Sequence, residues 1–250
     1  MKRRKRRQRR PKPPNFLLYL YPSPLRPKAP QEGLGQEVRK MVIGEEKITF
    51  ELVENEEALK KKIVEEHKEE AKRYTLLLFA DTIARRLAED HDVELQRVSF
   101  NSLEFTVFPP VNLLEFTVLA KKEGYEYEWR GDFVLLESDY GIFEVTIGGK
   151  VVNIRVVEWG RFYHKEAKRI ETETSMKRGD FVVYNKSLIR LTNVIKLPRY
   201  APRSFPLLFV GTRKEQNRFY VDEKSTVEMR TREASLKISF EKPCIISFSS

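Results

Sequence analysis

The chain has 250 residues, of which 40% are hydrophobic and 34% charged, so it has enough apolar material for a folded core and enough length for one or two domains. Its single cysteine, Cys244, excludes an internal disulfide framework and a zinc site built mainly on cysteine, and its three histidines leave little for a metal cluster. No apolar run approaches the ~18 residues of a membrane helix. We therefore expect an intracellular protein with no membrane partner, cytoplasmic or nucleoid-associated, or nuclear in a eukaryote.

The net charge of +10 is unevenly placed along the chain. Residues 1–12 carry nine cations and no acid, whereas the remaining chain is nearly neutral. Within that remainder, residues 45–144 have a net charge of −11 and residues 145–214 a net charge of +10. A polyanion could neutralise both basic regions, with a salt-dependent affinity that comes from counterion release. Abundant Lys and Glu, with only 5 Gln and 8 Asn, also resemble the composition of hyperthermophile proteins.

Residues 1–14 (MKRRKRRQRRPKPP) are a charge block followed by prolines, which favours a disordered basic arm that becomes ordered on a partner. The cations of this arm are Lys2, Arg3, Arg4, Lys5, Arg6, Arg7, Arg9, Arg10 and Lys12. The segment resembles the arginine-rich motif of the lentiviral Tat family in composition. That resemblance implies only that the arm can bind phosphate backbones and can be read as a nuclear-import signal in a eukaryotic cell. A solubility tail is the alternative interpretation.

Residues 15–40 are predicted to form an extended strap and linker. Their apolar run, FLLYLY, is shorter than the hydrophobic region of a signal peptide and is not followed by a small-residue cleavage site. We expect it to dock as an edge strand. Four prolines and two glycines then favour a linker.

The strongest helical pattern in the chain lies between Asn55 and Asp90, as either one long helix or two with a break near Tyr74–Thr75. A short strand, residues 47–53, precedes it, and Asn55 is a suitable N-cap with two glutamates in the first turn. Apolar residues then recur close to a period of 3.6. Residues 76–80 are apolar on all sides, which predicts that the second half of the helix is the more deeply buried. His67 lies among glutamates, and we expect it on a solvated face.

Two copies of the word LEFTV, in residues 102–107 and 113–118, favour a β-hairpin. In each copy Leu, Phe and Val alternate with Glu and Thr, a pattern typical of a strand with one buried face. Pro109 and Pro110 between them cannot donate hydrogen bonds to a sheet, so they are expected in the turn.

Two further short sequences, or words, each occur twice, and they follow each other in the same order along the chain. RGDFV is found at residues 130–134 and 178–182, and RFY at residues 161–163 and 218–220. Each RGDFV opens an apolar run of strand type, and Gly-Asp is favourable turn chemistry. The words predict an internal duplication, with chance coincidence as the alternative.

We therefore predict an α+β fold, in which an N-terminal strand and a long helix pack on an extensive antiparallel, internally duplicated β-region. Residues 41–120 are assigned to an α+β region with the long helix and the hairpin. Residues 121–172 form a first β unit, and residues 173–250 form a second one with a proline-rich basic insertion at residues 197–206.

Residues 145–214 interleave cations with aromatic side chains, a composition suited to nucleic acid because cations neutralise phosphates and aromatic rings stack on bases. The residues predicted to bind are Arg155, Arg161, Tyr163, Lys165, Lys168, Arg169, Lys196, Arg199, Tyr200 and Arg203. Tyr163 and Tyr200 are expected to be exposed, and the insertion is expected to lie in a groove of the nucleic acid. For Trp159 and Phe162 a place in the core is the alternative.

Catalytic signatures are weak. The P-loop, G-x-S-x-G and H-E-x-x-H motifs are missing from the sequence. A Mg²⁺-dependent nuclease could use Asp132 or Asp139 with Glu144, but threonine stands where the catalytic lysine belongs. A metal-free phosphodiesterase or glycosylase could use His164 with Glu166, beside the aromatic and basic residues around them. Apart from Mg²⁺ in the nuclease alternative, no cofactor or metal is predicted.

The composition and the two basic regions predict a nucleic-acid-binding protein, for DNA or RNA, that uses the arm and the basic aromatic β-surface of residues 145–214. The alternatives are a nucleic-acid-processing enzyme, either a nuclease or a base-excising glycosylase, and a viral or mobile-element structural protein that packages nucleic acid. A homo-oligomer is compatible with each of them.

Overall fold

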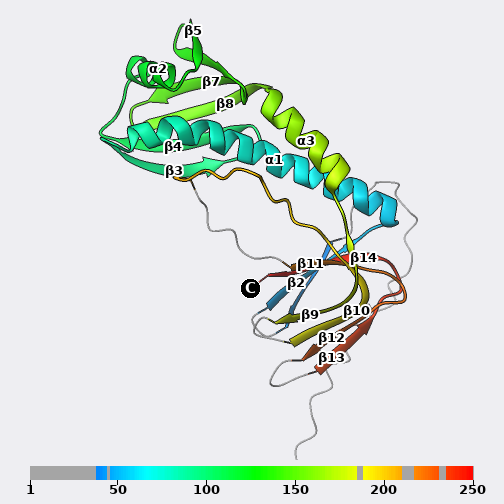
Figure 1. The fold of residues 1–250 in the computed structure, drawn as a ribbon. Coiled ribbons are helices and arrows are strands. Elements are labelled where there is room, and N and C mark those ends of the chain that lie inside the picture. The colour runs from blue at the N-terminus through cyan, green and yellow to red at the C-terminus, as the bar shows by residue number, and fades with distance from the viewer. Residues whose placement is uncertain (1–37, 44–45, 185–187, 210–216, 231–234, 250) are drawn as a thin grey trace, which may run out of the picture. The chain divides into compact units, whose positions relative to one another are not determined.

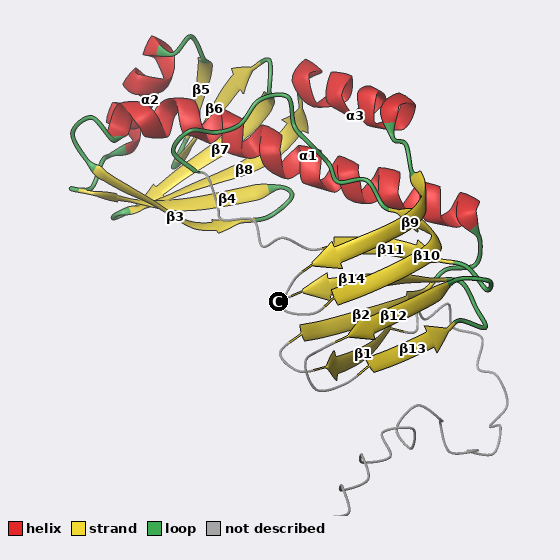
Figure 2. Cartoon of the chain, turned by 60° about the horizontal axis from the view of Figure 1, so that its bottom comes forward, coloured by secondary structure: helices red, strands yellow, loops and turns green. Residues whose placement is uncertain are grey.

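The computed structural model describes residues 38–43, 46–184, 188–209, 217–230 and 235–249. Within these ranges the chain forms three helices and fourteen strands in two antiparallel sheets (Figures 1 and 2), which confirms the α+β prediction. The predicted basic arm and nearly all of the predicted strap and linker lie outside the described residues. Among the described residues, no helix is both long enough and apolar enough to cross a membrane.

The six-stranded sheet is built from one continuous stretch of chain. In spatial order its strands are β3 (Asp92–Val98), β4 (Ser102–Phe108), β8 (Val151–Trp159), β7 (Gly141–Gly148), β6 (Phe133–Ser138) and β5 (Glu126–Arg130). Every neighbouring pair is antiparallel. Because strand side chains alternate between faces, one face carries the buried residues and the other is solvated, as β4 illustrates with Leu103, Phe105 and Val107 buried and the residues between them partly exposed.

Helix α1 (Glu56–Leu87) begins and ends as the sequence predicts. The side chain of Asn55 accepts a hydrogen bond from the backbone nitrogen of Ala58 at 2.8 Å, which satisfies one of the free donors of the first turn. The second half of α1 packs in the core of the six-stranded sheet, where the Phe79 ring stacks on Phe143 with centroids 3.7 Å apart. The apolar residues of the first half lie in a separate cluster with strands of the other sheet.

The eight-stranded sheet combines strands from the two ends of the described chain. Its strands are β1 (Val38–Ile43), β2 (Glu46–Leu52), β9 (Lys177–Tyr184), β10 (Leu188–Lys196), β11 (Asn217–Val221), β12 (Thr226–Arg230), β13 (Ser235–Ser239) and β14 (Cys244–Ser249). Along one edge, β10 pairs with β9. Along the other, its first half pairs with β12 and its last residues with β11. Both branches contribute to one core, which includes Ile189, Phe219, Met229 and Ile246.

Cys244 lies in that sheet and gives a direct chemical test of it. The residue is 2% exposed, and burial raises the pKa of its thiol to about 12. Only the thiolate reacts with disulfide reagents, and β14 is paired on both edges, with β11 and β2. We expect the folded chain at mildly alkaline pH to react with Ellman's reagent far more slowly than the denatured chain, as followed by thionitrobenzoate release. Equal rates for the two states would contradict this placement of β14.

The predicted LEFTV hairpin is wrong. The first copy is strand β4, but it pairs with β3 and β8, and the second copy opens helix α2 (Leu113–Lys122). The side chain of Asn112 accepts a hydrogen bond from the backbone nitrogen of Glu115 at 2.9 Å and so caps this helix. Phe116, Thr117 and Ala120 are the buried residues of α2, a helical spacing that the alternating pattern concealed.

The repeated words do not mark a repeated structure. Residues 130–134 run from the end of β5 through a two-residue turn, with Gly131 at a positive φ of 69°, to the start of β6, whereas residues 178–182 lie inside strand β9. The RFY words differ more, because residues 161–163 begin a helix and residues 218–220 lie in β11. The same short word takes the conformation that its surroundings impose, so the predicted duplication is not supported by the fold. The predicted boundary between residues 120 and 121 also falls inside the six-stranded sheet region.

Candidate nucleic-acid interface

Helix α3 (Arg161–Glu173) holds five of the ten predicted binding residues outside the arm, and its first turn is fixed on the six-stranded sheet. The backbone nitrogen of Gly160 donates to Tyr140 O at 2.8 Å, and that of Phe162 donates to Asp139 O at 3.0 Å. A side chain at position 160 would begin only 2.4 Å from Asp139 O, so glycine is required there. The tight approach sets the direction in which α3 leaves β8.

The inner face of α3 packs against α1. Tyr163, Glu166 and Ile170, spaced three and four residues apart, are its buried residues. The Tyr163 ring lies 5.1 Å from the ring of Trp159, and Lys72 Nζ of α1 lies 6.0 Å from its centroid. The prediction that Tyr163 is exposed is therefore wrong, since it is only 8% exposed and burial raises the pKa of its hydroxyl.

The outer face of α3 is basic. We define the α3 stripe as the four exposed residues Arg161, His164, Lys165 and Lys168, which follow the helical spacing i, i+3, i+4 and i+7. Arg161 pairs with Asp139 at 3.0 Å, but the two side chains are 83% and 76% exposed, and such surface pairs stabilise little. Lys165 and Lys168 have no ion-pair partner among the residues that the structure describes. These two lysines therefore present uncompensated positive charge.

The predicted proline-rich insertion is not a free arm. We define the crossing strap as residues 197–209, which run beside α1 in Figure 1. Leu197 lies in the apolar cluster that includes the first half of α1, the backbone nitrogen of Leu208 donates to Asp81 Oδ1 at 2.7 Å, and Phe209 enters the core of the six-stranded sheet. The strap thus connects the eight-stranded sheet with the core of the six-stranded one.

Tyr200 of the crossing strap is buried rather than exposed as predicted. Its ring lies 5.7 Å from that of Tyr74, and its hydroxyl donates to Glu166 Oε1 at 3.0 Å. Burial, with the negative charge of Glu166 beside it, raises the pKa of this hydroxyl. His67 is buried beside it, with Nε2 3.2 Å from Pro198 O, so its expected place on a solvated face is also wrong.

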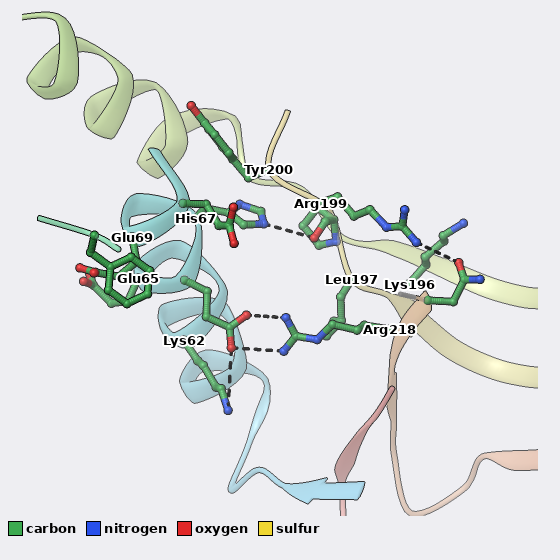
Figure 3. A pocket seen from close by; sticks show the side chains of 14 residues that line it. Lys62, Glu65, His67, Glu69, Lys196, Leu197, Arg199, Tyr200 and Arg218 are labelled. Carbon is green, nitrogen blue, oxygen red and sulfur yellow. Dashed lines mark hydrogen bonds and ion pairs between the residues drawn. The ribbon is translucent and has the colours of Figure 1, made fainter. Parts of the chain in front are cut away.

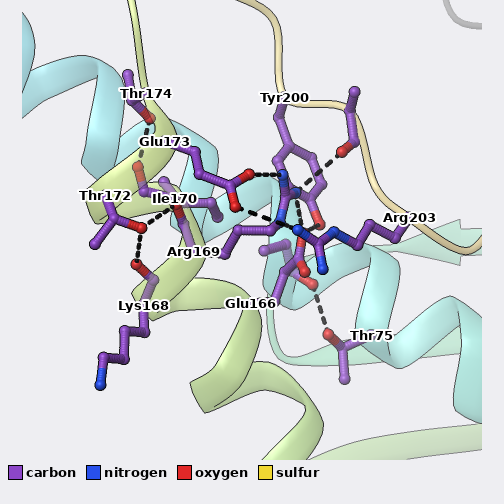
Figure 4. A network of polar contacts seen from close by, with 12 residues as sticks. Thr75, Glu166, Lys168, Arg169, Ile170, Thr172, Glu173, Thr174, Tyr200 and Arg203 are labelled. Carbon is purple, nitrogen blue, oxygen red and sulfur yellow. Dashed lines mark hydrogen bonds and ion pairs between the residues drawn. The ribbon is translucent and has the colours of Figure 1, made fainter.

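The remaining arginines of this region are engaged in a polar network between α3 and the strap (Figure 4). Arg169 pairs with Glu166 and Glu173 and also donates to Ala201 O at 3.1 Å, so its pKa is raised by those hydrogen bonds. Arg203 pairs with Glu173 at 3.2 Å. In Figure 4 the Lys168 side chain extends away from this network. The network neutralises two of the predicted binding cations and leaves the α3 stripe outside it.

A groove of about 510 Å³ separates the glutamate-rich face of α1 from the start of the strap (Figure 3). Oppositely charged side chains connect the two walls of this groove, since Arg218 donates two hydrogen bonds to the carboxylate of Glu66 on α1. Arg199 donates to Asn217 Oδ1 at 3.3 Å, and Lys196 Nζ lies 6.0 Å from the Phe219 ring. Because acidic residues of α1 face these cations, the predicted binding residues Lys196 and Arg199 do not form a positive surface here.

The carboxylates of the nuclease alternative are not brought together. Glu144 on β7 stands opposite Leu135 of β6, which is three residues from Asp132 and four from Asp139, so either aspartate lies about 10 Å or more along the sheet from Glu144 at the usual rise per residue. Glu144 on β7 accepts a hydrogen bond from Arg155, the predicted binding residue of β8, at 2.6 Å. Among the described residues, no group of three or more His, Cys, Asp or Glu side chains is placed to hold a metal ion.

The residues of the glycosylase alternative also separate. His164 is exposed on the outer face of α3, and its ring contacts only that of Tyr163 among the ring contacts of the described residues, at 5.5 Å. Glu166, two positions later and about 200° around the helix, is buried on the inner face and bound to Tyr200 and Arg169. A proton cannot pass directly between the two side chains in this arrangement.

Sequence reasoning found the cations of the stripe but missed the helix that aligns them. Residues after 121 were predicted to be β structure, so the amphipathic helix at residues 161–173 was missed. In this helix buried Tyr163, Glu166 and Ile170 alternate with exposed basic residues at helical spacing. A helical-period test of residues 161–173 contained that signal. A scan of the chain against protein-family models found no match, and a search of curated proteins found no significant relative.

Proposed function

We propose that this chain is a nucleic-acid-binding protein that contacts the phosphate backbone through the α3 stripe and the basic arm of residues 1–12. The observation that carries the proposal is the stripe itself, in which Lys165 and Lys168 are exposed beside Arg161 and His164 and have no carboxylate partner among the described residues. An unpaired cation on a rigid helix is free to displace a counterion from a phosphate.

The geometry of α3 suits a backbone contact. From Arg161 to Lys168 the helix advances about 10 Å, which matches the rise of about three nucleotides on one DNA strand. The first turn of α3 contains no acidic residue, so the positive end of the helix dipole adds to the potential of the stripe. These contacts recognise phosphates rather than base edges, so we propose binding with strong salt dependence and little sequence preference.

The stripe is tested by removing two charges from it and two from elsewhere. We expect Lys165→Gln/Lys168→Gln to reduce the slope of log Kobs against log salt by about 1–2, because each lost phosphate contact removes about 0.9. The matched control is Lys60→Gln/Lys61→Gln, two exposed lysines of α1 with the same change in net charge. Binding to labelled single- and double-stranded DNA and RNA would be measured by mobility shift over a salt series.

Two outcomes would contradict the proposal. If the α3 and α1 variants lose affinity equally, only net charge matters and the stripe is not an interface. If neither variant changes the slope while both keep the wild-type circular dichroism, the phosphate contacts lie elsewhere. Cleavage of the probe or formation of abasic sites in the same gels, with or without Mg²⁺, would favour the enzymatic alternatives instead.

A further inference from the structure

Strand β5 ends the six-stranded sheet with an open edge. All five of its residues are exposed, and it pairs with β6 on one side only among the described residues. Edge strands in monomeric proteins are commonly protected by charged side chains, above all lysine, by proline or by a bulge. The strand β5, EYEWR, has no lysine, proline or bulge, and its three charged residues are of both signs, so they can pair across an interface.

The edge strand also carries exposed aromatic residues on its core-facing side. Tyr127 and Trp129 stand opposite Leu136 and Val134 of β6, which are fully buried, so all four lie on one face of the sheet. Tyr127 and Trp129 are nevertheless each 42% exposed. The core-facing side of the sheet therefore extends beyond its buried region, and at its edge the rings of Tyr127 and Trp129 are exposed to solvent.

Helix α2 extends this apolar surface. It lies beside β5 in Figure 1, and Lys121 Nζ lies 5.9 Å from the Tyr127 ring. Leu114 and Val118, seven and three residues before Lys121 on the same face of α2, are 64% and 47% exposed. We define the edge patch as Leu114, Val118, Tyr127 and Trp129. Exposed apolar side chains beside an unpaired strand are typical of an interaction site.

We propose that the edge patch is a dimer interface, in which β5 pairs antiparallel with β5 of a second copy about a twofold axis at Glu128. In this register Glu126 stands opposite Arg130 of the partner copy, and Tyr127 stands opposite Trp129. Each pair occurs twice, as an isologous interface requires. The strand is thus complementary to itself in apolar character and in the charges at its two ends, while the two Glu128 side chains stand opposite each other at the axis.

The other registers are less favourable. A twofold axis requires a residue to stand opposite itself if the core faces of the two sheets are to be continuous. An axis at Tyr127 would place Glu126 opposite Glu128 twice, which is repulsive. An axis at Trp129 would place Glu128 opposite Arg130 twice, but it would pair Tyr127 with Gly131 of the turn, so fewer residues of β5 would take part in the contact. With the axis at Glu128, the Glu128 carboxylates of the two copies stand opposite each other. Arg130, which pairs with Glu128 at 2.7 Å within each chain, reduces the repulsion between them.

The test is a charge swap, measured by sedimentation velocity on the full chain over a concentration series without nucleic acid. We expect wild type to form dimers, and Arg130→Glu to weaken dimerisation by about tenfold or more, because it places glutamate opposite glutamate at two positions. The double variant Glu126→Arg/Arg130→Glu restores opposite charges at both positions. We expect it to recover the wild-type dimer.

Recovery of the dimer in the double variant would show that residues 126 and 130 face each other, because a general effect of net charge would not depend on which residues are paired. A monomeric wild type at all concentrations would overturn the proposal, as would Arg130→Glu dimerising as well as wild type. A double variant as weak as Arg130→Glu would also overturn it, since the two residues would then not face each other. Because no nucleic acid is present, none of these outcomes depends on the function proposed for the α3 stripe.

Discussion

Deletion of residues 1–12 is expected to lower the affinity of the chain for double-stranded DNA by about 10³-fold or more near 50 mM salt and to flatten the salt dependence of binding. The deleted segment carries nine of the 47 Lys and Arg residues and no acid. If each of its cations neutralises one phosphate, the slope of log Kobs against log salt falls by about 8. No other contiguous segment of the chain has such a charge density.

Two arm variants distinguish electrostatic from specific binding. An arm with the same composition in scrambled order should bind as wild type does, because counterion release depends on the number of charges. An arm with every Lys and Arg replaced by Gln should behave like the deletion. Fluorescence anisotropy of labelled DNA over a salt series measures both. An unchanged slope after deletion would exclude the arm as the electrostatic contact.

Phe79→Ala is expected to lower the free energy of unfolding by about 3–5 kcal/mol. Phe79 is fully buried in the second half of α1, stacked on Phe143 and 5.1 Å from the Tyr125 ring. Its loss leaves a cavity between the helix and the six-stranded sheet that rigid strands cannot fill. Denaturant unfolding, followed by circular dichroism, would measure the change.

Phe108→Ala is the matched control for that prediction. The same atoms are removed, but Phe108 is 65% exposed at the end of β4, so the expected change is within about 0.5 kcal/mol. A similar loss of stability in both variants would show that the stacked pair has no special role. A small effect of Phe79→Ala alone would mean that the core can close around the missing ring.

The sequence predicted α1 because its signals were local and in agreement. Asn55, the acidic first turn and the apolar period all lie within the helix or beside it, and the structure begins and ends the helix within three residues of the prediction. Strands β2 and β6 were also found from their own residues. The class α+β follows from such elements without knowledge of how they pair.

The second LEFTV shows where local reasoning fails. A run of six residues fits an alternating pattern and a helical one equally well, and the cap that decides between them, Asn112 with Glu115 three residues later, lies partly outside the repeated word. The same five residues are thus a strand in β4 and a helix in α2. Capping residues, rather than the apolar pattern, carried the information.

The exposure of the predicted tyrosines failed for a different reason. Tyr200 is buried because its hydroxyl meets Glu166, a residue 34 positions earlier in the chain, and Tyr163 because α1 covers it. Neither contact leaves a trace in the neighbouring sequence. Arg161, Lys165 and Lys168 are exposed, as expected for long charged side chains, which stay mostly at the surface whichever element carries them.

The pairing of β2 with β14 affects how the chain can fold while it is being synthesised. Every strand of the six-stranded sheet lies between Asp92 and Trp159, so that sheet can be completed while the chain is still being synthesised. In the eight-stranded sheet, Leu52 lies opposite Cys244, and β2 has no partner on that edge until β14 has been made. Among the described strands, β1 and β2 are synthesised first, and the open edge of β2 must wait for β14, an interval in which chaperones can bind it.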